Sequence, residues 1–247
     1  MGCCGKLSAG VEVIDPDREW ELWREWLGSE PKGQTINAEV VEMLVFRKIW
    51  RGFSVIHREA PERARKNATF VWWLRWNYAR SMGSAIRRQA EVRGDVISIG
   101  RLIDHVWRYP TVLTRERFVA MQSIDAPDLV NGWFDDLAGP GDYIHPEIPA
   151  QDMEELQERT AVVRRWVNKA VAHKDAKGRA GPPAAEINTC VDVLFDLFNK
   201  YSQLIRGVTT DRDVALTPWF GVFRTQWMPD DRWKEIATLV DGVDEEQ

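Results

Sequence analysis

Four long segments repeat apolar residues at intervals of three and four, and this pattern constrains the fold more than any other feature of the chain. The segments cover about residues 38–59, 67–92, 151–173 and 184–206. Intervals of three and four place apolar side chains on one face of an α-helix, and that face must be buried against other helices. No segment alternates apolar and polar residues convincingly, as a half-buried strand would. The pattern therefore predicts an all-α fold built around a four-helix bundle.

A shorter helix is expected ahead of the bundle. Asp15 is an N-cap acceptor and Pro16 follows it at the first helical position, a pairing typical of a helix start. Trp20, Trp23 and Leu27 then share one face of the helix that follows. We expect this helix to dock on the main body of the protein.

Two further parts of the chain should lie outside the bundle. Residues 110–150 contain prolines and glycines that interrupt any long helix, and we expect an irregular excursion there. Proline-led starts at Thr217-Pro218 and Pro229-Asp230 predict short helices in an aromatic-rich C-terminal extension. The expected organisation is an N-terminal tail and docking helix in residues 1–35, a helical bundle in 36–206 and the extension in 207–247.

The charge of the chain limits what it can bind. Its 247 residues include 33 Lys and Arg against 38 Asp and Glu, a net charge of −5. Non-specific coating of nucleic acid requires many cations, so any nucleic-acid contact should be local. No apolar run is long enough to span a bilayer, and the N-terminus lacks the apolar core of a signal peptide. We expect a cytoplasmic protein with no membrane contact.

The distribution of cysteine, histidine and acidic residues predicts neither a disulfide framework nor a metal site. The cysteines are Cys3, Cys4 and Cys190, without a Cys-x-x-Cys pair or histidines at zinc-ligand spacing. The acidic residues of 110–150 have no recognised ligand spacing either. We expect no metal ion and no cofactor. The 13 tryptophans are scattered through helical segments, so we expect most of them to be packing residues.

The strongest candidate for a functional site lies near the end of the segment 151–173. Arg165, Lys169 and His173 are spaced four residues apart and should form one stripe on a helix. A histidine that moves a proton, beside cations that hold a phosphate, is what metal-free phosphodiester cleavage needs. The alternative interpretation is that the cations form a solvated helix face and that His173 is only a favourable charge at the helix end.

Several short motifs resemble the AbiU-like branch of the HEPN superfamily. They are Arg87-Arg88-Gln89, the run from Arg93 to Ser98, the run from Arg101 to Asp104, and the run from Val167 to Asp175. The resemblance covers roughly residues 36–206. It implies a four-helix bundle and frequent homodimers with facing motif helices. It also implies a role in abortive infection or toxin–antitoxin systems, where an antitoxin or other partner protein would bind.

Many members of this superfamily are metal-independent endoribonucleases whose motif is an Arg, four to six intervening residues and a His. His173 matches the histidine, but Asn168 stands five residues before it and Arg165 eight, so the motif arginine is absent. In the catalytic interpretation, His173 transfers a proton of the ribose 2′-hydroxyl or of the leaving oxygen. Lys169 and Arg165 hold the phosphate, and Asn168 orients a phosphoryl oxygen or the imidazole.

Two more residues are candidates for RNA contact. Lys174 follows His173 directly, and Arg88 belongs with Asp95 to a polar motif ahead of the third helix. A structural role explains Arg88 and Asp95 equally well, as an arginine at a helix end and a cap.

Different classes of function are compatible with these residues. The first is a HEPN-type ribonuclease that acts on RNA in phage defence. The second is a catalytically inactive bundle that binds RNA or a protein through the same groove, and the missing arginine favours it. The third is a bundle held in a larger assembly by its tryptophan-rich ends, which predicts large exposed aromatic patches.

Overall fold

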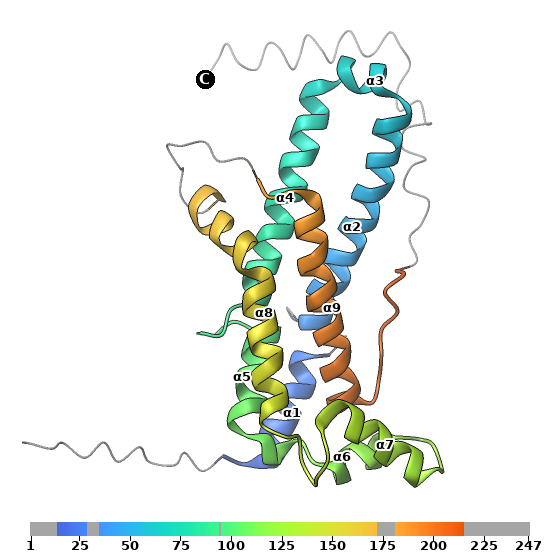
Figure 1. Ribbon diagram of the computed structural model, residues 1–247, viewed down its shortest axis with the longest axis vertical. Coiled ribbons are helices and arrows are strands. Elements are labelled where there is room, and N and C mark those ends of the chain that lie inside the picture. The colour runs from blue at the N-terminus through green and yellow to red at the C-terminus, as the bar shows by residue number, and fades with distance from the viewer. Residues whose placement is uncertain (1–13, 29–34, 94, 172–180, 215–247) are drawn as a thin grey trace, which may run out of the picture. The chain divides into compact units, whose positions relative to one another are not determined.

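The segments with the three-and-four pattern form long helices that pack side by side. The computed structural model describes residues 14–28, 35–93, 95–171 and 181–214. The bundle consists of α2 (Ile36–Glu59), α4 (Ala68–Gln89), α8 (Glu147–Trp166) and α9 (Ala184–Arg206), with α2 and α8 running opposite to α4 and α9 (Figure 1). The described residues contain no β-strand, only an isolated bridge between Thr114 and Tyr143. The predicted all-α bundle is confirmed.

The core of the bundle lies where these four helices meet. Helix α9 is buried along most of its length, with Cys190, Leu194, Phe198 and Tyr201 all almost inaccessible to solvent. Burial of each large apolar side chain stabilises the fold by roughly 1.5–3 kcal/mol. Among the described helices, none is both long enough and apolar enough to cross a membrane.

Helix α1 (Pro16–Trp26) begins and docks as its sequence predicts. The Asp15 carboxylate accepts hydrogen bonds from the backbone N–H groups of Asp17 (3.0 Å) and Arg18 (3.4 Å). Trp20, Trp23 and Trp26 are buried in the common core. Next to α1 lies α5 (Ile99–Arg108), where His105 Nδ1 lies 2.5 Å from the Glu19 carboxylate.

Residues 110–150 are more regular than their prolines and glycines predict. They hold a short 3₁₀ turn η1 (Pro110–Val112) and two helices, α6 (Arg115–Met121) and α7 (Pro127–Ala138). Pro127 begins α7 instead of breaking it, because the first helical position needs no N–H donor. Arg115 joins the two helices by pairing with Asp135 and donating to the carbonyl oxygen of Asn131 (3.1 Å). In the described residues, no three His, Cys, Asp or Glu side chains form a group that could hold a metal ion.

The end of α8 also differs from the regular helix that its pattern predicts. The α-helix stops at Trp166 and continues as a π turn, η2 (Val167–Val171). Trp166 and Val167 both pack against Gly83 of α4, where a Cβ would lie 2.8 Å from Val167 Cγ2 and 3.0 Å from Trp166 Cζ3. Only a residue without a side chain permits this approach of α4 and α8. Single π turns inside helices are frequent at functional sites.

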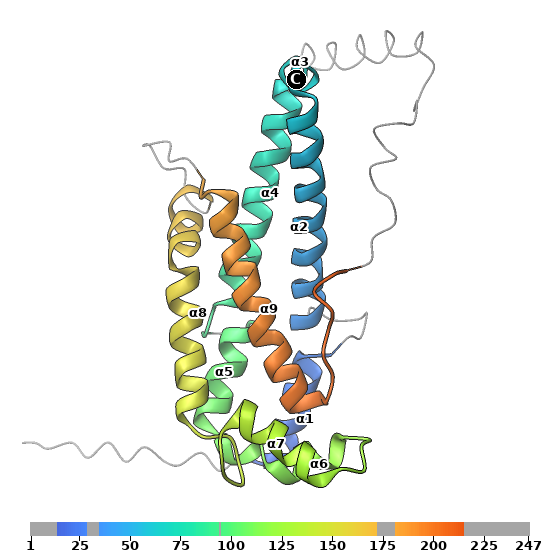
Figure 2. The ribbon, with the colours of Figure 1, turned by 45° about the vertical axis from the view of Figure 1, so that its right-hand side comes forward.

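Helices α2 and α4 extend beyond the ends of α8 and α9, and α3 (Pro61–Lys66) connects them (Figures 1 and 2). We call residues 47–80 the α2–α4 hairpin. At its base the Lys48 ammonium donates to the carbonyl oxygen of Val214 (2.6 Å) and pairs with Asp213. Helices α8 and α9 also contact this base, at Arg47 and Trp76, but the part of the hairpin nearer to α3 lacks the cover that they give to the rest of α2 and α4.

Candidate functional site

The end of α8 presents three of the predicted site residues to solvent. Arg165, Asn168 and Lys169 are all exposed. Arg165 Nε donates to the carbonyl oxygen of Ala161 (3.3 Å), and within the described parts of the chain neither Arg165 nor Lys169 has a carboxylate partner. The π turn begins between the two cations, so they no longer follow a regular α-helical stripe. Both positive charges nevertheless remain available to an anionic ligand.

His173 and Lys174 lie outside the described residues, and so does the C-terminal extension beyond Val214. Residues 172–180, which include His173, connect Val171 at the end of η2 to Gly181. Gly181 lies against the indole of Trp166, since a Cβ there would be 3.2 Å from Trp166 Cζ2. Trp166 is 7% exposed, and it packs against Gly181, the first described residue after this segment.

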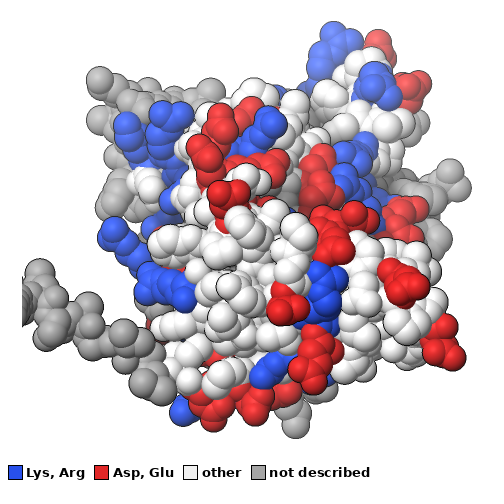
Figure 3. All heavy atoms as spheres, turned by 60° about the horizontal axis from the view of Figure 1, so that its bottom comes forward, with Lys and Arg blue, Asp and Glu red and all other residues white. Residues whose placement is uncertain are grey.

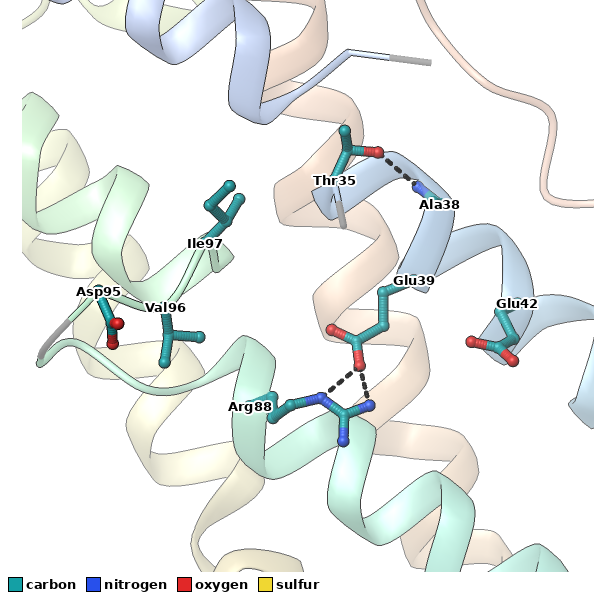
Figure 4. Close-up of a pocket in the computed structure, with 8 residues that line it drawn as sticks. All are labelled: Thr35, Ala38, Glu39, Glu42, Arg88, Asp95, Val96 and Ile97. Carbon is teal, nitrogen blue, oxygen red and sulfur yellow. Dashed lines mark hydrogen bonds and ion pairs between the residues drawn. The ribbon is translucent and has the colours of Figure 1, made fainter. Parts of the chain in front are cut away.

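Arg88 does not join this group of residues. Its guanidinium binds the carboxylate of Glu39 on α2, with Nε 2.7 Å from Oε1 (Figure 4). Gln89 donates to the same carboxylate. Gln157 Nε2 donates to the carbonyl oxygen of Ala90 (3.0 Å), which places this end of α4 beside the middle of α8. Eight residues of helix, about 12 Å along the axis, separate that level from Arg165.

A pocket of about 690 Å³ lies beside Arg88. Figure 4 shows Glu39, Glu42 and Asp95 around it, and Arg88 is the one cation among the described residues that line it. Three carboxylates against one guanidinium make this described lining acidic, which disfavours a phosphate. The geometry gives Arg88 a structural role, joining α4 to α2, and leaves its guanidinium occupied by Glu39.

Positive charge is concentrated on the α2–α4 hairpin instead. Residues 47–80 contain nine Lys and Arg against two Glu, a net charge of +7, while the rest of the chain carries −12. The exposed cations are Lys48, Arg51, Arg58, Arg65, Lys66, Arg75 and Arg80. At the end of the bundle that holds α6 and α7, acidic and basic side chains are interspersed and form no continuous basic surface (Figure 3). A count of charges along the sequence would have found the hairpin, but a search for a histidine-centred motif passes over it.

The same hairpin exposes large aromatic rings. Phe70, Trp72 and Trp73 of α4 are 48%, 62% and 52% exposed. Phe70 stacks on Trp73 with ring centroids 5.9 Å apart, and Trp72 stacks on Trp76 at 6.4 Å. We call these four side chains the aromatic patch. Most other described tryptophans are buried or half-buried, as expected of packing residues, with Trp107 of α5 the further exposed one.

The aromatic patch reaches the end of α8. Trp76 contacts Trp166 edge to face, with ring centroids 6.2 Å apart. Trp166 directly follows Arg165 and precedes the π turn that carries Asn168 and Lys169. The rings of Trp72, Trp76 and Trp166 thus form a continuous row from the hairpin to the candidate site.

The exposed groups at the end of α8 suit phosphate binding, because two cations and one amide donor are exposed within residues 165–169. Proton transfer at this place would need a further group, and the sequence offers His173, which lies outside the described residues. Comparison of the chain with protein-family models, curated proteins and solved structures finds no match. Its function has to be inferred from its own residues.

Proposed function

We propose that this protein is an AbiU-like HEPN bundle that binds RNA at the end of α8 and cleaves it without a metal ion through His173. The observation that supports this proposal is the exposure of Arg165 and Lys169 without carboxylate partners in the described structure, at the start of the segment that carries His173. Unpaired cations attract a polyanion, and their local position agrees with a chain whose net charge is −5.

In this mechanism the 2′-oxygen of a ribose attacks the adjacent phosphorus and the 5′-oxygen of the next nucleotide leaves. His173 removes the 2′-hydroxyl proton, and Lys169 and Arg165 stabilise the negative charge that develops on the phosphoryl oxygens. A second acid must protonate the leaving oxygen. A homodimer with facing α8 ends supplies it, because the second copy contributes its own His173.

The alternative is a catalytically inactive bundle that binds RNA or a partner protein at the same place. The observation that favours it is Asn168, which occupies the position of the motif arginine. Lys169 offers a point charge where arginine offers a planar fork that holds two phosphoryl oxygens. A site without this planar fork still attracts RNA through its charge. It holds the phosphate less precisely in the orientation that cleavage needs.

The test combines cleavage and binding by the full chain, with mixed RNA and EDTA present. If the protein is a ribonuclease, the parent cleaves RNA and His173→Ala does not. If it is the inactive form, neither cleaves, and Arg165→Glu with Lys169→Glu weakens binding. The control Arg18→Glu, at an exposed residue of α1, does not. Absence of both cleavage and binding would refute the proposal.

Molar mass measured at several concentrations tests the homodimer, and phage challenge of cells producing the parent or His173→Ala tests the role in defence.

A further inference from the structure

The aromatic patch lies on the most cationic part of the molecule. Phe70, Trp72 and Trp73 line a shallow pocket of about 480 Å³ together with Lys66. Contiguous exposed rings of this size are uncommon on a monomer surface and mark an interaction site. A ligand that binds these rings must also be compatible with the positive charge around them, which favours an anionic ligand.

The cations around the patch are placed to contact a ligand that lies on the rings. Lys66 lines the pocket itself, and the Arg80 guanidinium lies 4.7 Å from the centre of the Trp76 ring. Arg75, between the rings in sequence, is exposed and has no carboxylate partner among the described residues. Alternating aromatic and cationic side chains are typical of surfaces that stack bases and bind the phosphates between them.

We propose that the aromatic patch and its cations bind single-stranded RNA, with unpaired bases stacked on the rings of α4 and phosphates beside Lys66 and Arg75. This inference rests on the proposed function, because it takes RNA as the ligand. A duplex does not fit, since its bases are already stacked on one another. The contacts of Trp72 with Trp76, and of Trp76 with the buried Trp166, connect these exposed rings to the end of α8 that carries Arg165 and Lys169.

Charge favours RNA over the other occupants that exposed rings attract. A second copy placed hairpin to hairpin would bring two segments of +7 together, and these repel each other. A zwitterionic bilayer has no net negative charge to attract the exposed cations. RNA supplies both the flat rings and one negative charge per nucleotide.

The test measures binding of a fluorescein-labelled oligouridylate of about 12 nucleotides to the full chain by anisotropy. Trp72→Ala and Trp73→Ala should each weaken binding at least about 5-fold, as expected for the loss of one stacked base. Trp107→Ala is the matched control, because Trp107 is 51% exposed on α5. It should leave the affinity unchanged. Lys66→Glu and Arg75→Glu should weaken binding and flatten its salt dependence.

Each outcome distinguishes this inference from the proposed function. Binding that the two tryptophan changes leave intact, while Arg165→Glu with Lys169→Glu weakens it, overturns the inference and leaves the proposed function standing. The reverse pattern supports the hairpin and refutes RNA binding at α8. Equal affinity for a blunt duplex, binding to anionic vesicles without RNA binding, or a dimer that Trp72→Ala dissociates would each overturn the inference.

Discussion

Asp152 joins α8 to α9 inside the bundle, and its replacement by alanine should lower the free energy of unfolding by about 2–4 kcal/mol. Its side chain is nearly buried. The carboxylate accepts hydrogen bonds from the Lys200 ammonium (2.8 and 2.7 Å) and from the Tyr201 hydroxyl (2.8 Å). Removing it leaves both donors without their acceptor.

The magnitude follows from the different burial of the two donors. Tyr201 is fully buried, and burial together with Asp152 raises the pKa of its hydroxyl well above the usual 10, so it stays a donor. Loss of a buried hydrogen bond to a charged acceptor costs roughly 1.5–3 kcal/mol. The Lys200 side chain keeps 22% exposure, so its ammonium can turn to water. Its share is therefore at most about 1 kcal/mol.

Urea unfolding followed by circular dichroism at pH 7 measures this cost. The dependence on urea concentration should keep its slope, because the surface exposed on unfolding does not change. Lys200→Met is the control, since it breaks the ion pair and spares the tyrosine hydrogen bond. It leaves the nearly buried Asp152 carboxylate without its cation, so it should lower stability, but by less than Asp152→Ala because the carboxylate keeps the Tyr201 hydrogen bond.

Two results would contradict this reasoning. One is an Asp152→Ala variant within about 1 kcal/mol of the parent, which would mean that Tyr201 finds another partner at little cost. The other is a Lys200→Met variant as unstable as Asp152→Ala, which would assign the stabilisation to the ion pair.

Three further predictions concern packing and buried groups. Gly83→Val should lower the free energy of unfolding, measured in urea, by at least about 2 kcal/mol, because the valine side chain would collide with Val167 and Trp166. The control is Gly132→Ala in α7, where a Cβ meets nothing within 4 Å, and it should not lower the free energy of unfolding. Burial raises the pKa of the Cys190 thiol to about 12, so a thiol reagent at pH 8 should label it only after unfolding, as peptide mass spectrometry would show. Burial raises the pKa of Tyr78 from 10 to about 12, so the unfolded chain loses this proton first and stability should fall as pH rises from 10 to 12. Tyr78→Phe should make that fall shallower in unfolding curves measured across this range.

Local interactions explain why the helices could be predicted. The apolar period of residues 184–206 coincides with α9 as the structure has it, and Asp15 with Pro16 begins α1 where expected. Both signals depend on neighbours within one or two helical turns. The π turn after Trp166 was not predictable in this way, because it accompanies the close contact of α8 with Gly83 on another helix.

The candidate site was also predictable only where it depends on local sequence, and not where it depends on contacts between helices. The sequence identifies Arg165 and Lys169 as neighbours, but their availability depends on whether any carboxylate lies across from them. Arg88 has the same side chain, and Glu39, 49 residues away in the sequence, occupies it. Spacing along the chain carries no information about such a partner.

By itself, the amino-acid sequence determined the helical class of this protein, the starts of α1 and α9 and the concentration of positive charge in residues 47–80, since these depend on composition and short-range patterns. The tertiary structure decided which side chains face solvent. Trp23 and Trp72 both lie on amphipathic helices, yet Trp23 is inaccessible and Trp72 is 62% exposed. The reason is physical: burial requires another element on the opposite side, and α2 and α4 extend past the helices that could have supplied it.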